Sequence, residues 1–284
     1  MITKPYIISL APTGIIPTKA QTPHVPVSQS EILDTVAECL ELGVQMFHLH
    51  TRTPEQTHNS DPQQYGRLIE AIRTLPGGQQ AILCVTTSGR QNPSFEERAR
   101  ILDLDGDMKP DMASLTLSSL NFQRSASINE PDVIRQLAAR MQERGIKPEL
   151  EIFDFGMLNM ARVLMDEGLV DGHAYANLLF GNISSAQCTP LQMATLLREV
   201  PDNLTCCIAG LGRFQLQANL FGLMFADGVR VGLEDNIWYD QQRSQLATNV
   251  NLVKRIRQLG EQLERPLMSS QALRDRLLSD SSTL

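Results

Sequence analysis

Short apolar segments alternate with longer amphipathic segments along almost the whole chain. The short segments predict eight strands, at residues 5–11, 44–50, 80–87, 112–118, 148–154, 173–180, 204–210 and 228–234. The longer segments repeat apolar residues every three to four positions, which predicts helices at 28–43, 62–75, 94–104, 130–145, 156–168, 189–200, 214–228 and 241–263. Helix-end signals agree with these limits. Ser28 and Glu31 form a capping-box pattern, and Gly43, Gly145 and Gly168 stand where helices should end.

Eight strands that alternate with eight helices predict an α/β protein with the (β/α)8 architecture of a TIM barrel. The alternative is an open, doubly wound sheet, but no glycine-rich dinucleotide-binding motif follows the first strand. We expect one domain over residues 1–284, with the barrel core at about 5–262 and a C-terminal extension at 263–284. The end of this extension, SSQALRDRLLSDSSTL, predicts a short helix and a frayed end.

Composition and charge narrow the classes of function. The chain has 25 basic and 32 acidic residues, so its net charge of −7 argues against nucleic-acid binding. No apolar segment approaches the roughly 20 residues that span a bilayer, and the N-terminal segment does not match a secretory signal. The cysteines are an odd set without C-x-x-C spacing, which indicates reduced thiols in a cytoplasmic protein. They are Cys39, Cys84, Cys188, Cys206 and Cys207.

Two histidines end the second predicted strand. In VQMFHLH, His48 and His50 are two residues apart, so both imidazoles project from one face of the strand. Barrel active sites collect at the C-terminal ends of strands, and two imidazoles on one ion suit Zn²⁺. A hydrogen-bonded structural pair is the alternative. The other histidines, His24, His58 and His173, lack this spacing, and we expect them to be structural or exposed.

Charged residues gather at the end of the last predicted strand, in RVGLEDN at 230–236. Arg230, Gly232 and Glu234 should share one strand face, where Glu234 can supply the third ligand of a His₂Glu metal site. Asp235 should turn off that face and be free to act as a base or to orient one. The alternative is a surface salt bridge at a strand end.

Two glutamates occupy alternate positions of KPELEIFD at 147–154. Glu149 and Glu151 should face the barrel interior, where a carboxylate is costly unless a cation or metal pairs with it. Arg230 is the expected partner of Glu151. The alternative is that this strand face points outward towards a helix.

Hydroxyl groups stand at the ends of the third and fourth predicted strands. Thr86, Thr87 and Ser88 lie in VTTSG, and Ser114 and Thr116 lie in ASLTLSS. Hydroxyls and amides at strand ends suit a carboxylate or enolate ligand.

Taken together, these motifs resemble the β-keto acid cleavage enzyme family, which includes a 3-keto-5-aminohexanoate cleavage enzyme. The matching stretches follow in order over nearly the whole chain. They are PTG at 12–14, FHLHTR at 47–52, TTSG at 86–89, ASLTLSSLNF at 113–122, KPELEIFDFGM at 147–157, AGLGRFQ at 209–215 and RVGLEDN at 230–236. The combination of H-L-H with G-x-E-D-N is the most specific part of the resemblance.

The resemblance implies a homotetrameric (β/α)8 enzyme with one divalent metal, usually zinc. It implies a retro-Claisen type of transfer, in which a β-keto acid and acetyl-CoA give acetoacetate and a new acyl-CoA. It implies that the metal ligands are His48, His50 and Glu234. The catalytic positions that it implies are Asp235, Arg230, Glu151, Thr86 and Ser114, and the substrate-binding positions are Gly89, Thr116 and Ile16.

Two positions differ from the aminohexanoate enzyme and bear on the substrate. Ile16 stands where that enzyme has a glutamate for the substrate's ammonium group, so a cationic amino-keto acid is not expected. Arg90 follows Gly89 and could meet an anionic substrate tail, although a solvated surface arginine is the alternative.

Two other functions compete with this interpretation. One is a metal-dependent hydrolase of a small carbonyl substrate on the same barrel, but such enzymes commonly use histidines on later strands, and only His173 is available, at the start of a strand. The other is a non-catalytic barrel that binds a metal or ligand. The intact set of His48, His50, Glu234 and Asp235 argues against such a loss of activity.

Overall fold

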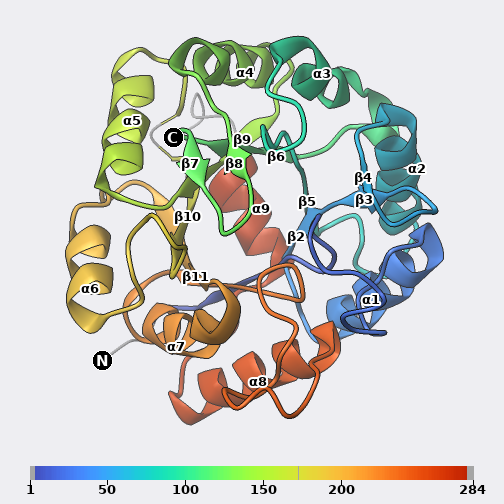
Figure 1. Ribbon diagram of the computed structural model, residues 1–284, viewed down its shortest axis with the longest axis vertical. Helices are drawn as coiled ribbons and strands as arrows, with labels where there is room; N and C mark the ends of the chain where they lie inside the picture. Colours follow the sequence, from blue (N-terminus) through green and yellow to red (C-terminus); the bar gives the residue numbers. More distant parts are fainter. Residues whose placement is uncertain (1–3, 172, 280–284) are drawn as a thin grey trace.

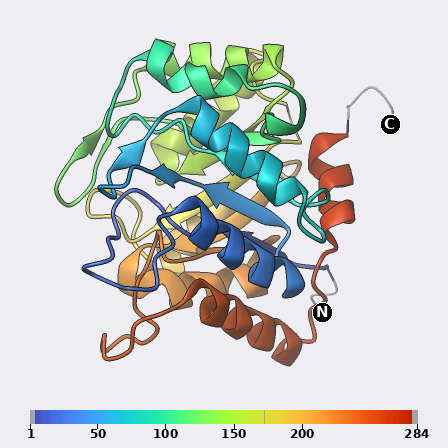
Figure 2. The ribbon, with the colours of Figure 1, turned by 90° about the vertical axis from the view of Figure 1, so that its right-hand side faces the viewer.

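The chain folds into a closed parallel barrel surrounded by helices (Figures 1 and 2). The structure, a computed structural model, describes residues 4–171 and 173–279. Within these residues the strands follow the order β1-β12-β11-β10-β9-β6-β5-β2. They are β1 (Ile7–Leu10), β2 (Met46–Leu49), β5 (Ile82–Val85), β6 (Met112–Thr116), β9 (Lys147–Ile152), β10 (Tyr175–Phe180), β11 (Thr205–Gly210) and β12 (Gly228–Val231). Because β1 pairs with both β2 and β12, the sheet closes, and the predicted TIM barrel is confirmed.

A helix follows each barrel strand. The helices are α1 (Gln29–Glu41), α2 (Pro62–Arg73), α3 (Phe95–Ala99), α4 (Pro131–Glu143), α5 (Phe155–Asp166), α6 (Pro190–Arg198), α7 (Gln215–Phe225) and α8 (Asn249–Gln262). The predicted capping box of Ser28 and Glu31 begins α1. Gly43, Gly145 and Gly168 have φ values of 82°, 59° and 71° just past α1, α4 and α5, as expected for helix-terminating glycines.

Several elements differ from the predicted ones. Helix α8 begins at Asn249 rather than at residue 241, because the Asp240 carboxylate accepts the amide N–H groups of Ser244 and Gln245 and holds this segment in a turn. The third helix ends at Ala99, and a 3₁₀ turn (Arg100–Asp103) continues it.

Two small antiparallel hairpins were not predicted. One joins β3 (Thr51–Arg52) to β4 (His58–Asn59), and the other joins β7 (Leu120–Asn121) to β8 (Ala126–Ser127). Both follow barrel strands directly, so they extend the end of the barrel at which the strands terminate (Figure 2).

The residues that line the barrel interior change from apolar to polar along the strands. In β2 the sequence of alternate positions is Met46 and then His48, and in β5 it is Ile82 followed by Cys84. The apolar end forms a buried cluster of its own, which contains Ile7, Met46, Ile82, Cys84, Met112, Tyr175 and Cys207. The polar end is therefore the end at which the strands terminate, where barrel enzymes carry their active sites.

A ninth helix, α9 (Ser270–Leu278), closes the apolar end of the barrel. Figure 1 shows it across the middle of the ring of helices, and Figure 2 places it at the end opposite to the hairpins. Leu273 and Leu277 are buried in the interior cluster, and the Arg274 guanidinium donates to the Ala81 carbonyl and to Asp111. The short helix predicted in the extension is thus present. The predicted frayed end, at 280–284, lies outside the described residues.

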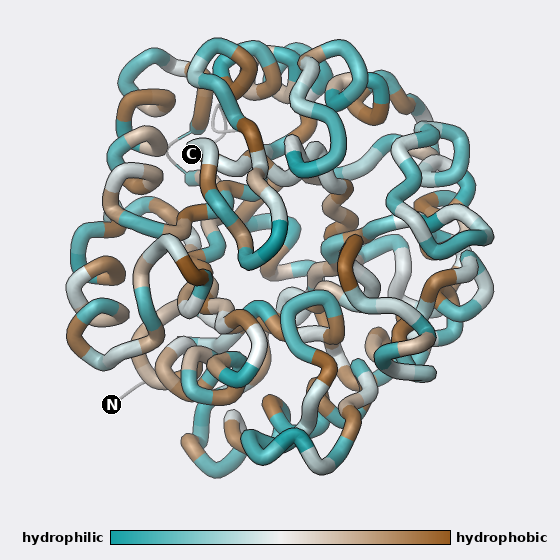
Figure 3. Tube along the Cα trace, viewed as in Figure 1, coloured by the Kyte–Doolittle hydropathy of each residue, from teal (hydrophilic) through white to brown (hydrophobic). Residues whose placement is uncertain are grey.

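The hydropathy of the chain follows this arrangement. Figure 3 shows hydrophobic and hydrophilic residues alternating along the turns of the outer helices, as an amphipathic pattern requires. Cys206 and Cys207 belong to the outer and inner apolar clusters respectively, so these adjacent cysteines face opposite sides of β11 as expected. Among the described helices, none is long and apolar enough to cross a membrane.

Candidate active site

Two histidines and a glutamate converge at the polar end of the barrel. The Nε2 atoms of His48 and His50 are 3.1 Å apart, and Glu234 Oε1 lies 3.4 Å from His50 Nε2 and 3.9 Å from His48 Nε2. A tetrahedral zinc ion with Zn–N bonds of about 2.0–2.1 Å separates two nitrogen ligands by roughly 3.3 Å. These three side chains therefore fit a divalent metal site, and the second carboxylate oxygen of Glu234 is buried without a hydrogen-bond partner among the described residues.

Glu234 reaches this position from a turn rather than from a strand. The strand β12 ends at Val231, and Gly232 adopts a φ of 148° that turns the chain. The Glu234 amide then donates to the Ala11 carbonyl of the neighbouring segment. The prediction that the strand extends to residue 234 was wrong, although Glu234 does join the two histidines.

Gly14 packs directly against Glu234. A Cβ atom on Gly14 would lie 2.5 Å from the Cγ of Glu234, and the φ of Gly14 is +62°. The carbonyl of Gly14 also accepts a hydrogen bond of 2.6 Å from the Nε of Arg52. The PTG and HTR motifs therefore meet behind Glu234 and hold it in place.

Arg230 connects the acidic residues of the site. Its guanidinium donates to both carboxylate oxygens of Asp235, at 3.0 and 3.2 Å, and to Glu234 at 2.9 Å. It also reaches Glu151 at 3.4 Å, which confirms the expected pairing of these two residues. Asp235 lies in the turn after Gly232, and its carboxylate is paired with Arg230. Its role as a base stays a prediction.

The two neighbouring acids have opposite pKa shifts. Burial raises the pKa of the Asp235 carboxyl above its ordinary value, and Arg230 only partly opposes this effect. Burial also acts on Glu234, but the positive charges of His50, Arg230 and His48 outweigh it and hold the pKa of Glu234 well below its ordinary value. Asp235 is consequently the better proton acceptor of the two, whereas Glu234 stays ionised as a metal ligand must.

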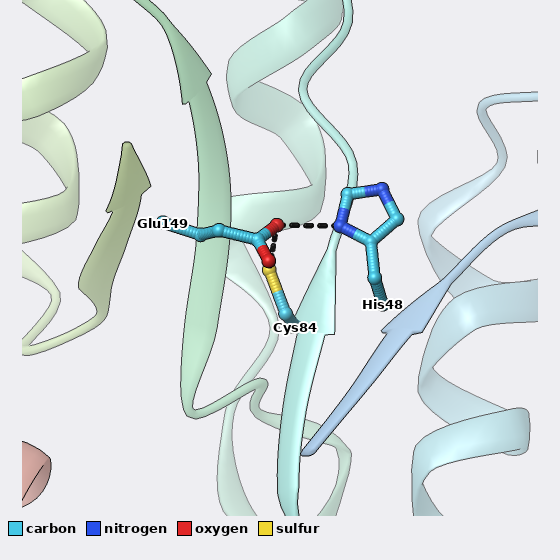
Figure 4. Close-up of side chains that lie close together, drawn as sticks. All are labelled: His48, Cys84 and Glu149. Atoms are coloured by element: carbon cyan, nitrogen blue, oxygen red, sulfur yellow. Dashed lines mark hydrogen bonds and ion pairs between the residues drawn. The ribbon is translucent and has the colours of Figure 1, made fainter. Parts of the chain in front are cut away.

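A buried hydrogen-bond network lies beneath His48 (Figure 4). His48 Nδ1 is 2.5 Å from a carboxylate oxygen of Glu149, and the Cys84 thiol donates to the same oxygen at 3.1 Å. The Asn177 amide donates to the other oxygen at 2.8 Å, and the Tyr175 hydroxyl donates to Asn177. A ring nitrogen that donates in this way leaves the opposite nitrogen, Nε2, for a metal.

A second group of possible metal ligands combines an ionised carboxylate with a protonated thiol. His48, Cys84 and Glu149 lie close enough to hold an ion. Burial and the negative charge of Glu149, however, raise the pKa of the Cys84 thiol well above its ordinary value, so the thiol stays protonated. Burial disfavours the charged form of Glu149, but the His48 imidazole outweighs it and lowers the pKa of Glu149 to about 2. Glu149 is thus a charged partner of His48. The sequence predicted that Glu149 faces the barrel interior, but it did not predict this contact.

The hydroxyl groups predicted at strand ends are buried next to the charged residues. Thr116 Oγ1 donates to Glu151 at 2.6 Å. Ser114 Oγ accepts the Thr87 amide at 3.2 Å, and Thr86 Oγ1 accepts the Ser88 amide at the same distance. They hold the TTSG turn against the neighbouring strand. Their contact with a substrate stays a prediction.

The remaining candidate positions lie on the rim. Gly89 is pressed against the β7–β8 hairpin, since a Cβ atom there would lie 2.1 Å from the Ile128 carbonyl. Ile16 is 55% exposed. His58, which we expected to be structural or exposed, places its ring 6.2 Å from that of His50, because the β3–β4 hairpin folds back over the site. His24 and His173 are exposed, as expected.

The fold and this site define the class of protein. A closed (β/α)8 barrel that ends in a His₂Glu set beside a buried Arg–Asp pair is a barrel enzyme equipped for carbonyl chemistry. A family model described as beta-keto acid cleavage enzyme matches residues 5–278. The chain belongs to this family, and it is an enzyme rather than a non-catalytic barrel.

Relatives and solved structures agree with this assignment. The chain is 36% identical over 271 residues to 3-oxoadipate:acetyl-CoA acetyltransferase of Cupriavidus necator, covering 94% of this chain and 92% of the relative. It is 30% identical to a 3-keto-5-aminohexanoate cleavage enzyme of Fusobacterium nucleatum, covering 92% and 93% of the two chains. The apo structure of ObcA matches with a TM-score of 0.76 at 18% identity, covering 90% of this chain. This chain spans 66% of the length of ObcA, and the likeness shows the shared fold.

Proposed function

We propose that the protein transfers an acyl group from a β-keto acid to coenzyme A, with acetyl-CoA as the second substrate. The bond between C2 and C3 of the keto acid breaks, and C2 forms a bond to the acetyl carbonyl carbon. The acyl group that contains C3 passes to the sulfur of coenzyme A, so the products are acetoacetate and a new acyl-CoA. Family membership and relatives named for acetyl-CoA-dependent reactions support this proposal.

We propose zinc as the metal, with His48, His50 and Glu234 as its ligands. The observation that carries this proposal is the convergence of two imidazole nitrogens and a carboxylate within 4.8 Å of one another. When bound there, a divalent metal supplies a Lewis acid that polarises the substrate ketone.

Asp235 is the general base in this proposal, with Arg230 and Glu151 as its supports. A base must be able to accept a proton, and the pKa of Asp235 is raised by burial. Arg230 donates to both oxygens of Asp235 and also to Glu151, whose carboxylate accepts a hydrogen bond from Thr116. Asp235 takes a proton from C2 of the keto acid. The hydroxyls of Thr86 and Ser114 are placed to donate to the negative charge that develops.

The substrate is not an amino-keto acid in this proposal. Ile16 has no charge to pair with an ammonium group, and Gly89 and Thr116 add none. The relative with the highest identity quoted above acts on 3-oxoadipate by name, and that compound has no amino group.

We also propose a cytoplasmic homotetramer. Free cysteines support a reducing compartment, since all the described cysteines are unpaired. Strongly exposed apolar side chains, among them Ile183 at 66% and Phe225 at 60%, support contact with further subunits. Light scattering after size-exclusion chromatography measures the assembly directly.

Mass spectrometry of the acyl-CoA products tests the reaction. Zinc-loaded protein is mixed with acetyl-CoA and a panel of neutral, anionic and cationic β-keto acids. We expect acetoacetate and a new acyl-CoA to appear together from at least one keto acid. Hydrolysis of esters or amides without acetyl-CoA would instead favour a metal hydrolase.

The variant His48→Ala tests the ligand assignment. Removal of one of three ligands should abolish both metal binding and turnover, because the remaining two cannot hold the ion tightly. His24→Ala is the matched control, since the His24 side chain is exposed. Full activity of His48→Ala would refute the metal site.

A further inference from the structure

Arg90 stands at the mouth of the site on a firmly held turn. It follows the TTSG segment after β5, and its backbone N–H donates to Ser88 Oγ at 3.3 Å. The turn before it is fixed by Arg98, whose Nε donates to the Thr87 carbonyl at 2.7 Å. Gly89 packs against the β7–β8 hairpin. The start of the Arg90 side chain therefore has little freedom to move.

The guanidinium of Arg90 is held flat against an aromatic ring. Its central carbon lies 3.5 Å from the centre of the Phe122 ring. Phe122 in turn packs edge-on against Phe153, with ring centres 5.8 Å apart. Phe153 directly follows β9, two residues after Glu151. The stacked guanidinium thus belongs to the same end of the barrel as the acidic residues.

The guanidinium of Arg90 donates no hydrogen bond to the described residues. Its Nε is buried and has no partner within the described part of the chain. Arg52 at the same end of the barrel differs, because its Nε donates to the Gly14 carbonyl at 2.6 Å, whereas Arg255 shares a buried Nε without a partner among the described residues. A guanidinium that is stacked but unsatisfied is prepared for a ligand, since burying its donors without an acceptor is costly.

The surrounding charges make an anion the fitting ligand. Burial lowers the pKa of Arg90, and the carboxylates of Glu234 and Glu151 partly offset this effect. Both of those carboxylates are paired with Arg230, so neither supplies the hydrogen bonds that Arg90 lacks. A planar guanidinium binds a carboxylate through two parallel hydrogen bonds.

We propose that Arg90 binds a second carboxylate, at the end of the keto acid remote from C1, so that the substrates are β-keto dicarboxylic acids. This inference rests on the proposed function. Ile16 offers no charge on the loop after β1, and a relative is named for 3-oxoadipate, a keto acid with such a second carboxylate.

Two keto acids of equal chain length test the proposal. 3-Oxoadipate ends in a carboxylate, and 3-oxohexanoate ends in a methyl group at the same position. We expect the wild-type enzyme to prefer 3-oxoadipate in kcat/KM. Arg90→Gln should lower kcat/KM for 3-oxoadipate by about 10- to 100-fold, the loss expected for a charge-assisted hydrogen bond, and should leave 3-oxohexanoate unaffected.

Matched variants separate this effect from a general loss of positive charge. Arg124 lies on the same hairpin as Phe122 and is exposed, so Arg124→Gln should keep the full preference for 3-oxoadipate. Arg90→Lys keeps the charge but not the planar fork, and it should recover part of the lost preference.

Other outcomes would overturn the proposal. If Arg90→Gln lowers kcat/KM equally for both keto acids, Arg90 binds the C1 carboxylate that both share, or it binds no part of the substrate. A raised KM for acetyl-CoA alone would place a phosphate of coenzyme A there. If wild-type protein turns over neither keto acid, the proposed function fails. Calorimetric titration with adipate and hexanoate then tests the Arg90 site without the reaction. If Arg90 binds the second carboxylate, the wild-type protein binds adipate more tightly than hexanoate, and Arg90→Gln loses that preference.

Discussion

At the scale of single residues, the direction of one imidazole decides what the site can bind. Glu149 takes Nδ1 of His48 and leaves Nε2 to face His50 and Glu234. Asn177 and Cys84 hold the Glu149 carboxylate in turn, so the ring cannot easily rotate. Glu149 is therefore a positioning residue that acts through His48.

Replacing Glu149 by Gln should weaken zinc binding. Glutamine keeps the shape and an acceptor oxygen, but it removes the negative charge that makes His48 a stronger ligand. We expect a loss of about 10- to 100-fold in metal affinity, measured by competition with a chromophoric chelator. Glu151→Gln is the matched control, because Glu151 contacts Arg230 and Thr116 but neither histidine. Equal affinity in wild type and Glu149→Gln would contradict this role.

The sequence predicted several residue contacts, among them the pairing of Arg230 with Glu151 and the approach of Glu234 to the histidines. His48 and His50 were predicted to act together because alternate positions of a strand face one way. The inward position of Glu149 and Glu151 followed for the same reason. The two hydrogen bonds from Arg230 to the Asp235 carboxylate could not be predicted, since they depend on how the chain turns at Gly232. The proximity of His58 to His50 depends on a hairpin that no periodic pattern announced.

At the scale of elements, the loop after β1 supports Glu234, which lies in the turn after β12. Gly14 packs against Glu234 with a φ that favours glycine, and a Cβ atom there would lie 2.5 Å from the Glu234 Cγ. A side chain at this position would push Glu234 away from the histidines. The glycine of the PTG motif is thus required by both conformation and space.

Gly14→Ala should lower both stability and metal affinity. The positive φ costs about 1 kcal/mol with any β-carbon, and the clash at 2.5 Å displaces Glu234 in addition. Gly168→Ala separates the two effects, because Gly168 also has a positive φ but no atom within 4 Å of the added carbon. Denaturant unfolding and zinc titration of both variants measure the result. If both variants bind zinc like wild type, Gly14 does not position Glu234.

Strands and helices were predicted well where amphipathic packing alone defines them. All eight barrel strands fall within or within one residue of their expected segments. The start of α8 was misplaced because apolar residues recur before it, while Asp240 and the Thr248 cap decide where the helix begins. Short hairpins carry too few residues to show a period.

At the scale of the whole molecule, the barrel is closed at one end and functional at the other. The helix α9 covers the apolar end, so ligands have to approach the histidines from the side of the hairpins (Figure 2). The amphipathic pattern of the extension predicted this helix, but not its destination. The spacing of apolar residues shows which face of a helix is apolar. It does not show which part of the protein that face packs against.

Leu273→Ala should destabilise the fold and spare the site. Leu273 is fully buried among the interior residues, so its truncation should cost about 2–5 kcal/mol in the free energy of unfolding. Leu191→Ala is the control for chemistry, because Leu191 is 77% exposed and should change stability little. Zinc affinity of folded Leu273→Ala should equal that of wild type. A stability equal to that of Leu191→Ala would show that α9 does not seal the barrel.

The covering of the barrel by α9 also has a consequence for the order of synthesis. A ribosome has made every strand once it has passed Val231, yet the interior cluster still lacks Leu273 and Leu277. A growing chain can therefore pair its barrel strands while the apolar end of the barrel is still exposed to water and to other proteins. Until α9 has been synthesised and has packed against the barrel, this apolar surface can bind chaperones or other nascent chains. The packing of α9 therefore ends the period in which the new chain is most prone to aggregate.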